Sequence, residues 1–503
     1  MRGTRGLSLA GIAAAVSLLV APAANGPDLA TVFDDYVTQA VEDWEAVGLA
    51  VAVVKDGELV FAKGYGIRDI EAAGAVDAHT LFAIGSTTKA ITAAAIGILR
   101  DEGKLDWDDK VTTHLPDFEL FDPYVTRELT IRDLLTHRAG LGNADSLWYR
   151  TDISAADVVA RARFIEPAYS FRAGYTYQNI MYATAGAVVE AVSGQSWATF
   201  VQERILTPMG MTGTVPLFTD TDGRDNVAAP HYRIDGELIR ADNASVDNVA
   251  AAGSIWSSVT DMSRWMRLML GGGELDGIRL LEPATHAELL RPQIVIPPGA
   301  FYPTTQLTQP HWTTYALGWF QHDYDGRFVS FHTGSIDGMV AINGLIPDED
   351  LGVYVLGNLD HVEIRHALMY KAFDLWGGEP DGRDWSTDLR EMYAEATEQQ
   401  RAAFAAFRAS RIEDTAPSRQ LIDFAGVYSD PLFGQIEIGV DGDSLVFEAA
   451  GRSAAMEHWH YDAFVVAWER PWLAPTAVAF AFDLGGTPTI RAFGRTFQRV
   501  RDQ

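Results

Sequence analysis

The chain has 503 residues, 48% of them hydrophobic, and is therefore long enough to form more than one folded domain. Its formal net charge of −29 disfavours nucleic acid and anionic lipid as partners, because both carry negative charge themselves. Cysteine is absent, which excludes disulfides, thiol catalysis and zinc sites built on cysteine.

The first 24 residues have the pattern of a secretory signal peptide. Arg2 and Arg5 precede an apolar stretch over residues 7–21, and Ala21-Pro22-Ala23-Ala24 supplies the small residues of a cleavage site. The alternative is a membrane anchor, but the apolar stretch is shorter than the ~20 residues that a transmembrane helix needs. We therefore expect residues 1–24 to direct export to the periplasm or the extracellular space, leaving no stable membrane span after cleavage.

Residues 25–378 combine strand patterns at both ends with helical patterns between them. A helix is predicted over residues 29–45, followed by two strands that meet at the turn Asp56-Gly57. Helical patterns then dominate, and strand patterns return before a last helix over residues 364–375. The order predicts an α+β domain in which one antiparallel sheet is flanked by helices and interrupted by a mainly helical insert. The later strands are expected at 317–322, 328–332, 338–345 and 351–358.

The last part of the chain changes character twice. Residues 379–415 contain an alanine-rich polar stretch that predicts a helical linker. Residues 416–503 contain eight short strand patterns separated by glycine-containing turns, which predicts a small β-barrel. The strands are expected near 424–428, 434–440, 444–448, 455–461, 463–469, 477–483, 489–493 and 496–500.

Ser86 is the only serine in the chain that has a lysine three residues downstream, in Ser86-Thr87-Thr88-Lys89. Residues i and i+3 share one face of a helix, so this spacing holds an amine beside a hydroxyl group. An adjacent amine can activate a serine as a nucleophile by accepting its proton. The motif follows an apolar run and Gly85, and residues 90–99 continue it as a strong helix former.

Two further motifs accompany this pair. Tyr177-Gln178-Asn179 lies in a turn-rich segment before the helix predicted over residues 182–192, so a phenol and a carboxamide can point into a cleft. His332-Thr333-Gly334-Ser335 is expected at the end of a strand, where a glycine lets another backbone approach closely.

Together, the three motifs resemble those of the serine β-lactamase and penicillin-binding protein superfamily, in the branch that has H-T-G in place of K-T-G. Residues 129–141 and 251–262 also resemble segments of this family, in the same order along the chain. The histidine branch contains class C-like serine hydrolases such as D-aminopeptidases and esterases. The region that begins at Phe424-Ala425-Gly426-Val427-Tyr428 resembles the lipocalin-like barrel that follows the hydrolase domain in some members.

The resemblance implies a role for each motif residue. Ser86 would attack an acyl carbonyl group, with Lys89 as its base and Tyr177 as partner base and later proton donor. For this role the pKa of Lys89 must be depressed by burial or by nearby positive charge. The backbone N–H groups of Ser86 and Ser335, beside Gly334, would bind the oxyanion. Asn179 would hold a substrate amide or orient Lys89, and His332 would line the site.

The sequence thus predicts an exported serine hydrolase that forms an acyl-enzyme on a small-molecule or peptide substrate. Histidine at position 332 weakens a fixed positive charge that would bind a substrate carboxylate, so the resemblance favours a peptidase or an esterase over a dedicated β-lactamase. The sequence does not identify the acyl donor, which can be a D-peptide, an amide, an ester or a β-lactam. No cofactor and no metal are expected. The alternative is a catalytically weak or inactive protein that binds a ligand in its C-terminal barrel. The sequence does not determine the oligomeric state.

Overall fold

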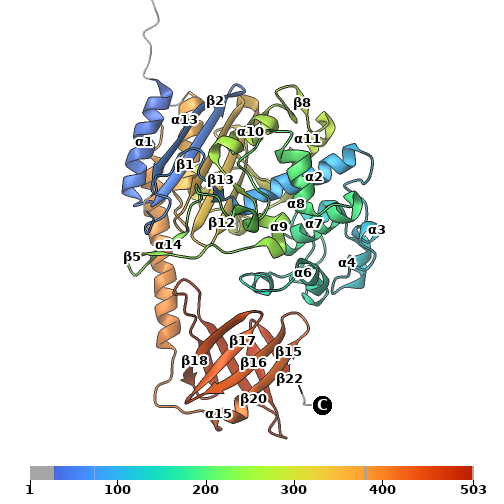
Figure 1. Cartoon of the computed structure of the whole chain (residues 1–503), viewed down its shortest axis with the longest axis vertical. Helices are drawn as coiled ribbons and strands as arrows, with labels where there is room; N and C mark the ends of the chain where they lie inside the picture. The colour runs from blue at the N-terminus through green and yellow to red at the C-terminus, as the bar shows by residue number, and fades with distance from the viewer. Residues whose placement is uncertain (1–27, 73, 379–381, 501–503) are drawn as a thin grey trace, which may run out of the picture.

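An eight-stranded antiparallel sheet forms the centre of the larger unit of the computed structural model (Figure 1). The structure describes residues 28–72, 74–378 and 382–500, so the expected signal peptide lies outside the described residues. The strand order is β2-β1-β14-β13-β12-β11-β10-β9. The strands are β1 (Gly48–Lys55), β2 (Glu58–Gly66), β9 (Ile294–Val295), β10 (Thr313–Tyr315), β11 (Phe320–Tyr324), β12 (Arg327–Ile336), β13 (Met339–Ile346) and β14 (Leu351–Gly357).

The N-terminal and C-terminal strands of this domain lie side by side in the sheet, as its second and third strands. Strand β1 pairs with β14, placing Val51 opposite Val355, and this confirms the expected closure of one antiparallel sheet by N- and C-terminal parts. Both faces of β1 are buried because its side chains alternate between two hydrophobic clusters. The helices α1 (Leu29–Asp43) and α13 (Ile364–Trp376) cover one face, and α2 (Thr88–Asp101) and α10 (Val259–Leu270) lie on the other side.

The mainly helical insert lies beside the sheet and surrounds α2, which is buried along almost its whole length (Figure 1). Further short strand pairs are β3 (Phe82–Ala83) with β6 (Trp256–Ser257), β4 (His231–Ile234) with β5 (Glu237–Arg240), and β7 (Glu274–Leu275) with β8 (Ile278–Arg279). The remaining helices are α3 (Val111–His114), α4 (Pro123–Glu128), α5 (Ile131–Leu135), α6 (Ala155–Arg161), α7 (Asn179–Ser193), α8 (Trp197–Val201), α9 (Ala250–Gly253), α11 (Pro283–Leu290) and α12 (Thr305–Thr308).

A long helix, α14 (Trp385–Ala409), leads from the sheet domain to a closed barrel of eight antiparallel strands in sequence order (Figure 1). The barrel therefore has the up-and-down topology that its short alternating strand patterns favour. The short helix α15 (Leu421–Phe424) precedes it. Its strands are β15 (Gly426–Asp430), β16 (Gly434–Asp441), β17 (Ser444–Ala449), β18 (Arg452–His460), β19 (Ala463–Val466), β20 (Thr476–Phe482), β21 (Pro488–Ala492) and β22 (Arg495–Arg499).

The barrel contacts the sheet domain through polar groups of the helical insert. Arg161 of α6 donates to the carbonyl oxygen of Leu432 at 3.2 Å, and Arg495 forms an ion pair with Glu166 at 2.7 Å. The backbone N–H of Asp152 donates to the Ala450 carbonyl oxygen at 3.3 Å. Among the helices of the described residues, none is both long and apolar enough to cross a bilayer.

Candidate active site

Ser86 lies in a single 3₁₀ turn, Gly85–Thr87, between β3 and the first residue of α2. The expectation of a continuous α-helix through the motif therefore needs a small correction. The side chains of Ser86 and Lys89 still lie side by side, because a 3₁₀ helix has three residues per turn and therefore places residues i and i+3 above each other. The Nζ atom of Lys89 lies 3.0 Å from the Oγ atom of Ser86.

Lys89 is completely buried, and its amine has three oxygen neighbours. Besides Ser86, Nζ donates to the side-chain oxygen of Asn179 and to the carbonyl oxygen of Ala252, each at 2.8 Å. Burial disfavours the ammonium form and lowers the pKa of Lys89 to about 7, although the negative charge of Asp145 raises it. The amine is therefore neutral in a large fraction of molecules near neutral pH, as a general base requires.

Tyr177 lies in the loop before α7, with its ring 4.8 Å from the Lys89 amine. Burial raises the pKa of its hydroxyl group well above the ordinary value, and the hydroxyl oxygen has no hydrogen-bond partner among the described residues. Tyr177 is therefore a neutral phenol that can donate a proton beside Ser86.

Asn179 is the first residue of α7, three residues earlier than the expected helix start. Its amide nitrogen donates to both carboxylate oxygens of Asp145 at 3.2 Å, which turns the amide oxygen toward Lys89. The indole of Trp148 also donates to Asp145, at 2.8 Å. Asp145 thus belongs to the candidate site, although sequence reasoning missed it because an aspartate in a loop carries no distinguishing pattern.

Strand β12 continues to Ile336, so His332 does not end the strand as expected. Its continuation brings Gly334 against the turn that holds Ser86. A Cβ atom on Gly334 would lie 2.0 Å from the Ile84 carbonyl oxygen, and one on Gly85 would lie 2.8 Å from the Ser335 nitrogen. Only glycine permits this approach, which places the Ser335 backbone nitrogen next to Ser86.

Arg365, near the start of α13, holds the peptide group between Gly334 and Ser335. Its Nη1 donates to the Gly334 carbonyl oxygen at 2.6 Å and to Ser335 Oγ at 2.9 Å, and Glu363 pairs with the same guanidinium at 3.0 Å. The C=O and N–H of a trans peptide point in opposite directions. The N–H of Ser335 therefore points away from Arg365. No sequence pattern around Arg365 indicated that this residue orients the peptide.

His332 does not line the candidate cavity, which corrects the sequence-based expectation. Side chains alternate along a strand, so Thr333 and Ser335 face the cavity, while His332 lies on the other side and is completely buried. Its Nδ1 bonds to the Thr333 carbonyl oxygen at 2.6 Å, and its Nε2 bonds to the Tyr315 hydroxyl group at 2.9 Å. Burial, with Lys89 nearby, lowers the pKa of His332 to about 3, so the ring is neutral.

His137 is a second buried histidine at the site that sequence reasoning did not single out. Its Nδ1 accepts the N–H of Gln178 at 3.0 Å, and its ring lies 4.4 Å from the ring of Tyr177. The side chain of Gln178 turns away from the cavity and donates to the carbonyl oxygens of Leu141 and Gly142. His137 thus helps to hold the loop that carries Tyr177.

Ser86 opens onto a cavity of about 380 Å³, and five of its twelve lining residues are aromatic. Of the residues that the structure describes, neither a lysine nor an arginine lines this cavity, and Asp145 is the one carboxylate that does. The lining residues are Ser86, Asp145, Tyr175, Tyr177, Asn179, Ala300, Phe301, Tyr302, Pro303, Phe320, Thr333 and Ser335.

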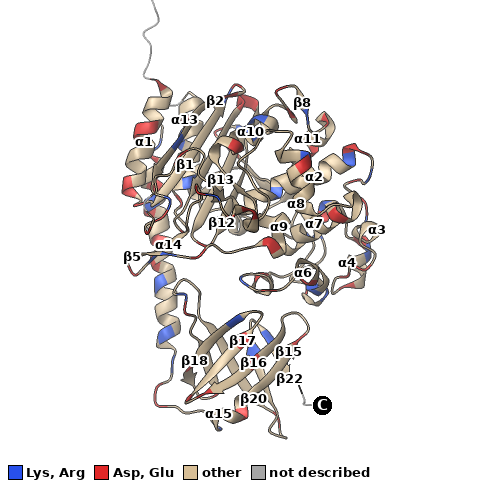
Figure 2. Cartoon of the chain, viewed as in Figure 1, with Lys and Arg blue, Asp and Glu red and all other residues tan. Residues whose placement is uncertain are grey.

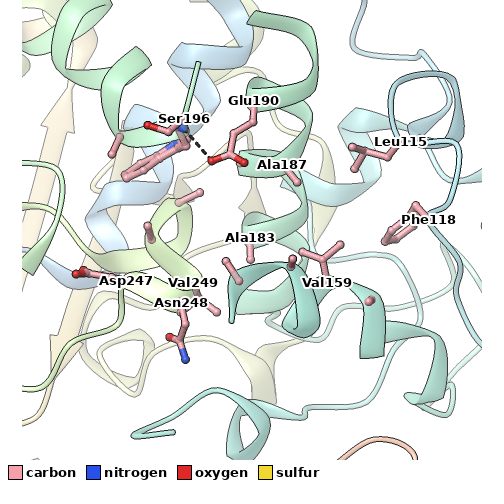
Figure 3. Close-up of a pocket in the computed structure, with 18 of the residues that line it drawn as sticks. Leu115, Phe118, Val159, Ala183, Ala187, Glu190, Ser196, Asp247, Asn248 and Val249 are labelled. Atoms are coloured by element: carbon pink, nitrogen blue, oxygen red, sulfur yellow. Dashed lines mark hydrogen bonds between the residues drawn. The ribbon is translucent and has the colours of Figure 1, made fainter. Parts of the chain in front are cut away.

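A second cavity, of about 550 Å³, lies between α6, α7 and the segment that contains Leu115 and Phe118 (Figure 3). Its walls are mainly small apolar residues such as Ala183 and Ala187. Glu190 accepts the backbone N–H of Trp197 at 3.0 Å and is held at one side of this cavity (Figure 3). Ser86 and Lys89 do not line it, so this cavity lacks the nucleophile and its amine partner.

The sheet with its helical insert, together with the juxtaposed serine, lysine, tyrosine and asparagine, places the chain in the β-lactamase and transpeptidase-like superfamily. The chain belongs to the beta-lactamase family, whose model matches residues 33–373. Residues 410–498, which include the barrel, match a second model, described as a domain of unknown function, DUF3471.

Two relatives show how far the similarity extends. The unguisins hydrolase ungD of Aspergillus violaceofuscus is 28% identical over 524 residues, which covers 93% of this chain and 90% of that protein. Protein flp of Staphylococcus aureus is 24% identical over 340 residues, which covers 65% of this chain and 62% of that protein. The first similarity thus spans both domains.

Solved structures share the fold over almost the whole chain. The octameric penicillin-binding protein homologue from Pyrococcus abyssi has a TM-score of 0.63 at 21% identity, covering 92% of this chain and 98% of that one. SurE with D-Leu has a TM-score of 0.56 at 19% identity, covering 95% of this chain and 100% of that one. At these identities the similarity establishes the fold alone.

Proposed function

We propose that the protein is an exported serine hydrolase that cleaves amides or esters through an acyl-enzyme on Ser86. The observation that carries this proposal is the contact of 3.0 Å between Ser86 Oγ and the buried Lys89 amine, whose pKa is about 7. The name of the fungal relative, an unguisins hydrolase, supports a hydrolytic reaction. The pattern of residues 1–24 supports export.

In the proposed acylation step, neutral Lys89 takes the proton of the Ser86 hydroxyl group as Oγ forms a bond to the substrate's carbonyl carbon. The oxygen of that carbonyl gains the negative charge and is held by the N–H groups of Ser86 and Ser335. The bond to the leaving group then breaks, and Tyr177 or the Lys89 ammonium supplies the proton that the leaving nitrogen or oxygen needs. Water hydrolyses the resulting ester.

The cavity favours an acyl donor that has no free carboxylate beside the scissile bond. Its walls contain several aromatic rings, Asp145 and no lysine or arginine, and the neutral ring of His332 lies behind Thr333. No cationic side chain of the lining would contact a carboxylate there directly, because Lys89 and Arg365 lie behind Ser86 and Ser335, and a buried carboxylate without a direct partner is unfavourable. Amides and esters of apolar acyl groups therefore fit better than substrates with a carboxylate at this position.

The test is mass spectrometry of the intact protein after exposure to D-amino-acid amides, short p-nitrophenyl esters and β-lactams. We expect a trapped acyl group on Ser86, and loss of both adduct and turnover in Ser86→Ala. Ser444→Ala, which changes an exposed serine of β17, is the matched control and should behave like the wild type. Hydrolysis by Ser86→Ala at the wild-type rate would disprove the proposal.

The alternative, a ligand-binding barrel, has less support. Aromatic and aliphatic side chains fill the barrel interior, where the rings of Phe424 and Phe480 lie 4.8 Å apart and Phe447 contacts Trp468. An apolar ligand would have to displace these close-packed side chains.

A further inference from the structure

A third cavity, of about 410 Å³, lies between the barrel and the sheet domain and is rich in arginine. Arg150 lines it from the sheet domain, and Arg452 and Arg470 line it from the barrel side. Within the described part of the chain, Glu469 is the one carboxylate that lines it. The lining thus contains three cationic side chains and one anionic side chain, whereas the chain as a whole has a net charge of −29.

Arg452 has no anionic partner anywhere in the described residues. Its guanidinium lies 5.2 Å from the centre of the Trp468 ring, and its Nε atom is buried without a hydrogen-bond acceptor. Burial lowers the pKa of Arg452, although Tyr149 nearby acts in the opposite direction. A partly desolvated cation without a partner is unfavourable, and an anion bound beside it would remove this cost.

The other charges around the cavity are already paired or exposed. Arg150 forms an ion pair with Asp337 at 2.6 Å, and Arg470 lies 3.6 Å from the exposed carboxylate of Asp242. Asp152 packs against the turn at Gly451, but it forms no ion pair with Arg452. Figure 2 shows basic segments at the end of the barrel nearest the sheet domain. The sheet domain, in contrast, carries many acidic residues.

We propose that this interdomain cavity binds a small anion, a carboxylate or a phosphate, through the guanidinium group of Arg452. Planar guanidinium groups bind both kinds of anion through paired, charge-assisted hydrogen bonds. The bound anion would connect the barrel to the loop of Tyr149 and Arg150. That loop begins at Asp145 in the candidate active site, and Asp337, the partner of Arg150, lies two residues after Ser335.

The test is isothermal titration of the full-length protein with inorganic phosphate, at an ionic strength kept constant with chloride. We expect saturable binding to the wild type, and binding weaker by about tenfold or more in Arg452→Gln, because a charge-assisted hydrogen bond is lost. Arg491→Gln, which removes an exposed arginine of β21 outside the cavity, is the matched control and should bind like the wild type. Absence of saturable binding to the wild type, or equal binding by Arg452→Gln, would overturn the proposal.

A second variant protects the test against a folding defect in Arg452→Gln. Glu469→Gln removes the one carboxylate of the lining, so we expect phosphate to bind more tightly to it. Weaker binding to Glu469→Gln would count against the proposal.

The kinetics of ester hydrolysis distinguish two sources of the anion. If phosphate raises KM alone, the cavity takes an anionic group of the substrate. If phosphate leaves the kinetics unchanged, the cavity takes a free anion. The binding experiment does not depend on Ser86, so it can succeed or fail independently of the proposed hydrolase activity.

Discussion

Lys89 and Asp145 are coupled through charge at the centre of the candidate active site. Burial lowers the pKa of Lys89, and the carboxylate of Asp145 opposes this effect. Asn179 lies between the two groups, because its oxygen accepts from Lys89 while its nitrogen donates to Asp145. The balance between burial and this one carboxylate sets the pH range in which Lys89 can accept a proton.

Replacement of Asp145 by asparagine should move the pH profile to lower pH. The wild-type kcat/KM should rise as pH increases through about 7, because Lys89 must lose its proton to act as a base. Removing the negative charge lowers the pKa of Lys89 further, so the rise should occur at lower pH in Asp145→Asn. The measurement is kcat/KM for a p-nitrophenyl ester across the neutral range, with Asp235→Asn, in an exposed turn, as the control. A shift to higher pH would contradict this account.

At the scale of elements, the candidate site lies where strand β12 packs against the turn Gly85–Thr87 before α2. Gly85 and Gly334 have no side chain, so these two segments can approach each other closely. Arg365 at the start of α13 holds the peptide group that joins Gly334 to Ser335. The nucleophile and the Ser335 nitrogen therefore depend on the packing of three elements that are far apart in the sequence.

The variant Gly334→Ala should strongly reduce activity while the domain still folds. The added methyl group would overlap the Ile84 carbonyl oxygen, so β12 must move away and withdraw the Ser335 N–H from the oxyanion. Loss of one such donor typically lowers kcat on the order of 100-fold or more. The measurements are kcat and the thermal unfolding temperature, compared with Gly439→Ala on β16, where an added methyl group meets no atom within 4 Å. Wild-type kcat in Gly334→Ala would show that this close approach is not needed.

At the scale of the whole molecule, the barrel packs against the loops that border the active site. Arg495 and the carbonyl oxygen of Leu432 contact the segment from Arg161 to Glu166, and Ala450 contacts Asp152. The proposed nucleophile and its partners all lie in the sheet domain. The barrel therefore supplies none of the groups described around Ser86 and touches the sheet domain through loops such as these.

Deletion of residues 416–503 should separate these two contributions. We expect Ser86 to remain reactive toward a small fluorophosphonate probe, because each group around it comes from the sheet domain. We expect KM for larger substrates to rise, because the loops after Gly142 lose their contacts with the barrel. The measurements are probe labelling and steady-state kinetics on short and long acyl substrates. Unchanged KM for every substrate would make the barrel a spacer or a separate binder.

The sequence by itself was sufficient for the two-part architecture and for the local pairing of Ser86 and Lys89. Alternating and helical patterns are local properties, and a spacing of three residues fixes which side chains share a face. The order of strand, helix and strand patterns likewise predicted one sheet closed by β1 and β14.

Only the tertiary structure decided what surrounds this pair. Asp145, His137 and Arg365 reach the site through packing between distant segments, and their sequence neighbourhoods carry no signal of it. His332 is the opposite case: its motif predicted that it lines the cavity, but its position in strand β12 directs its side chain into the core. Burial decides the pKa values of Lys89 and His332, and burial is a property of the folded chain that no local pattern contains.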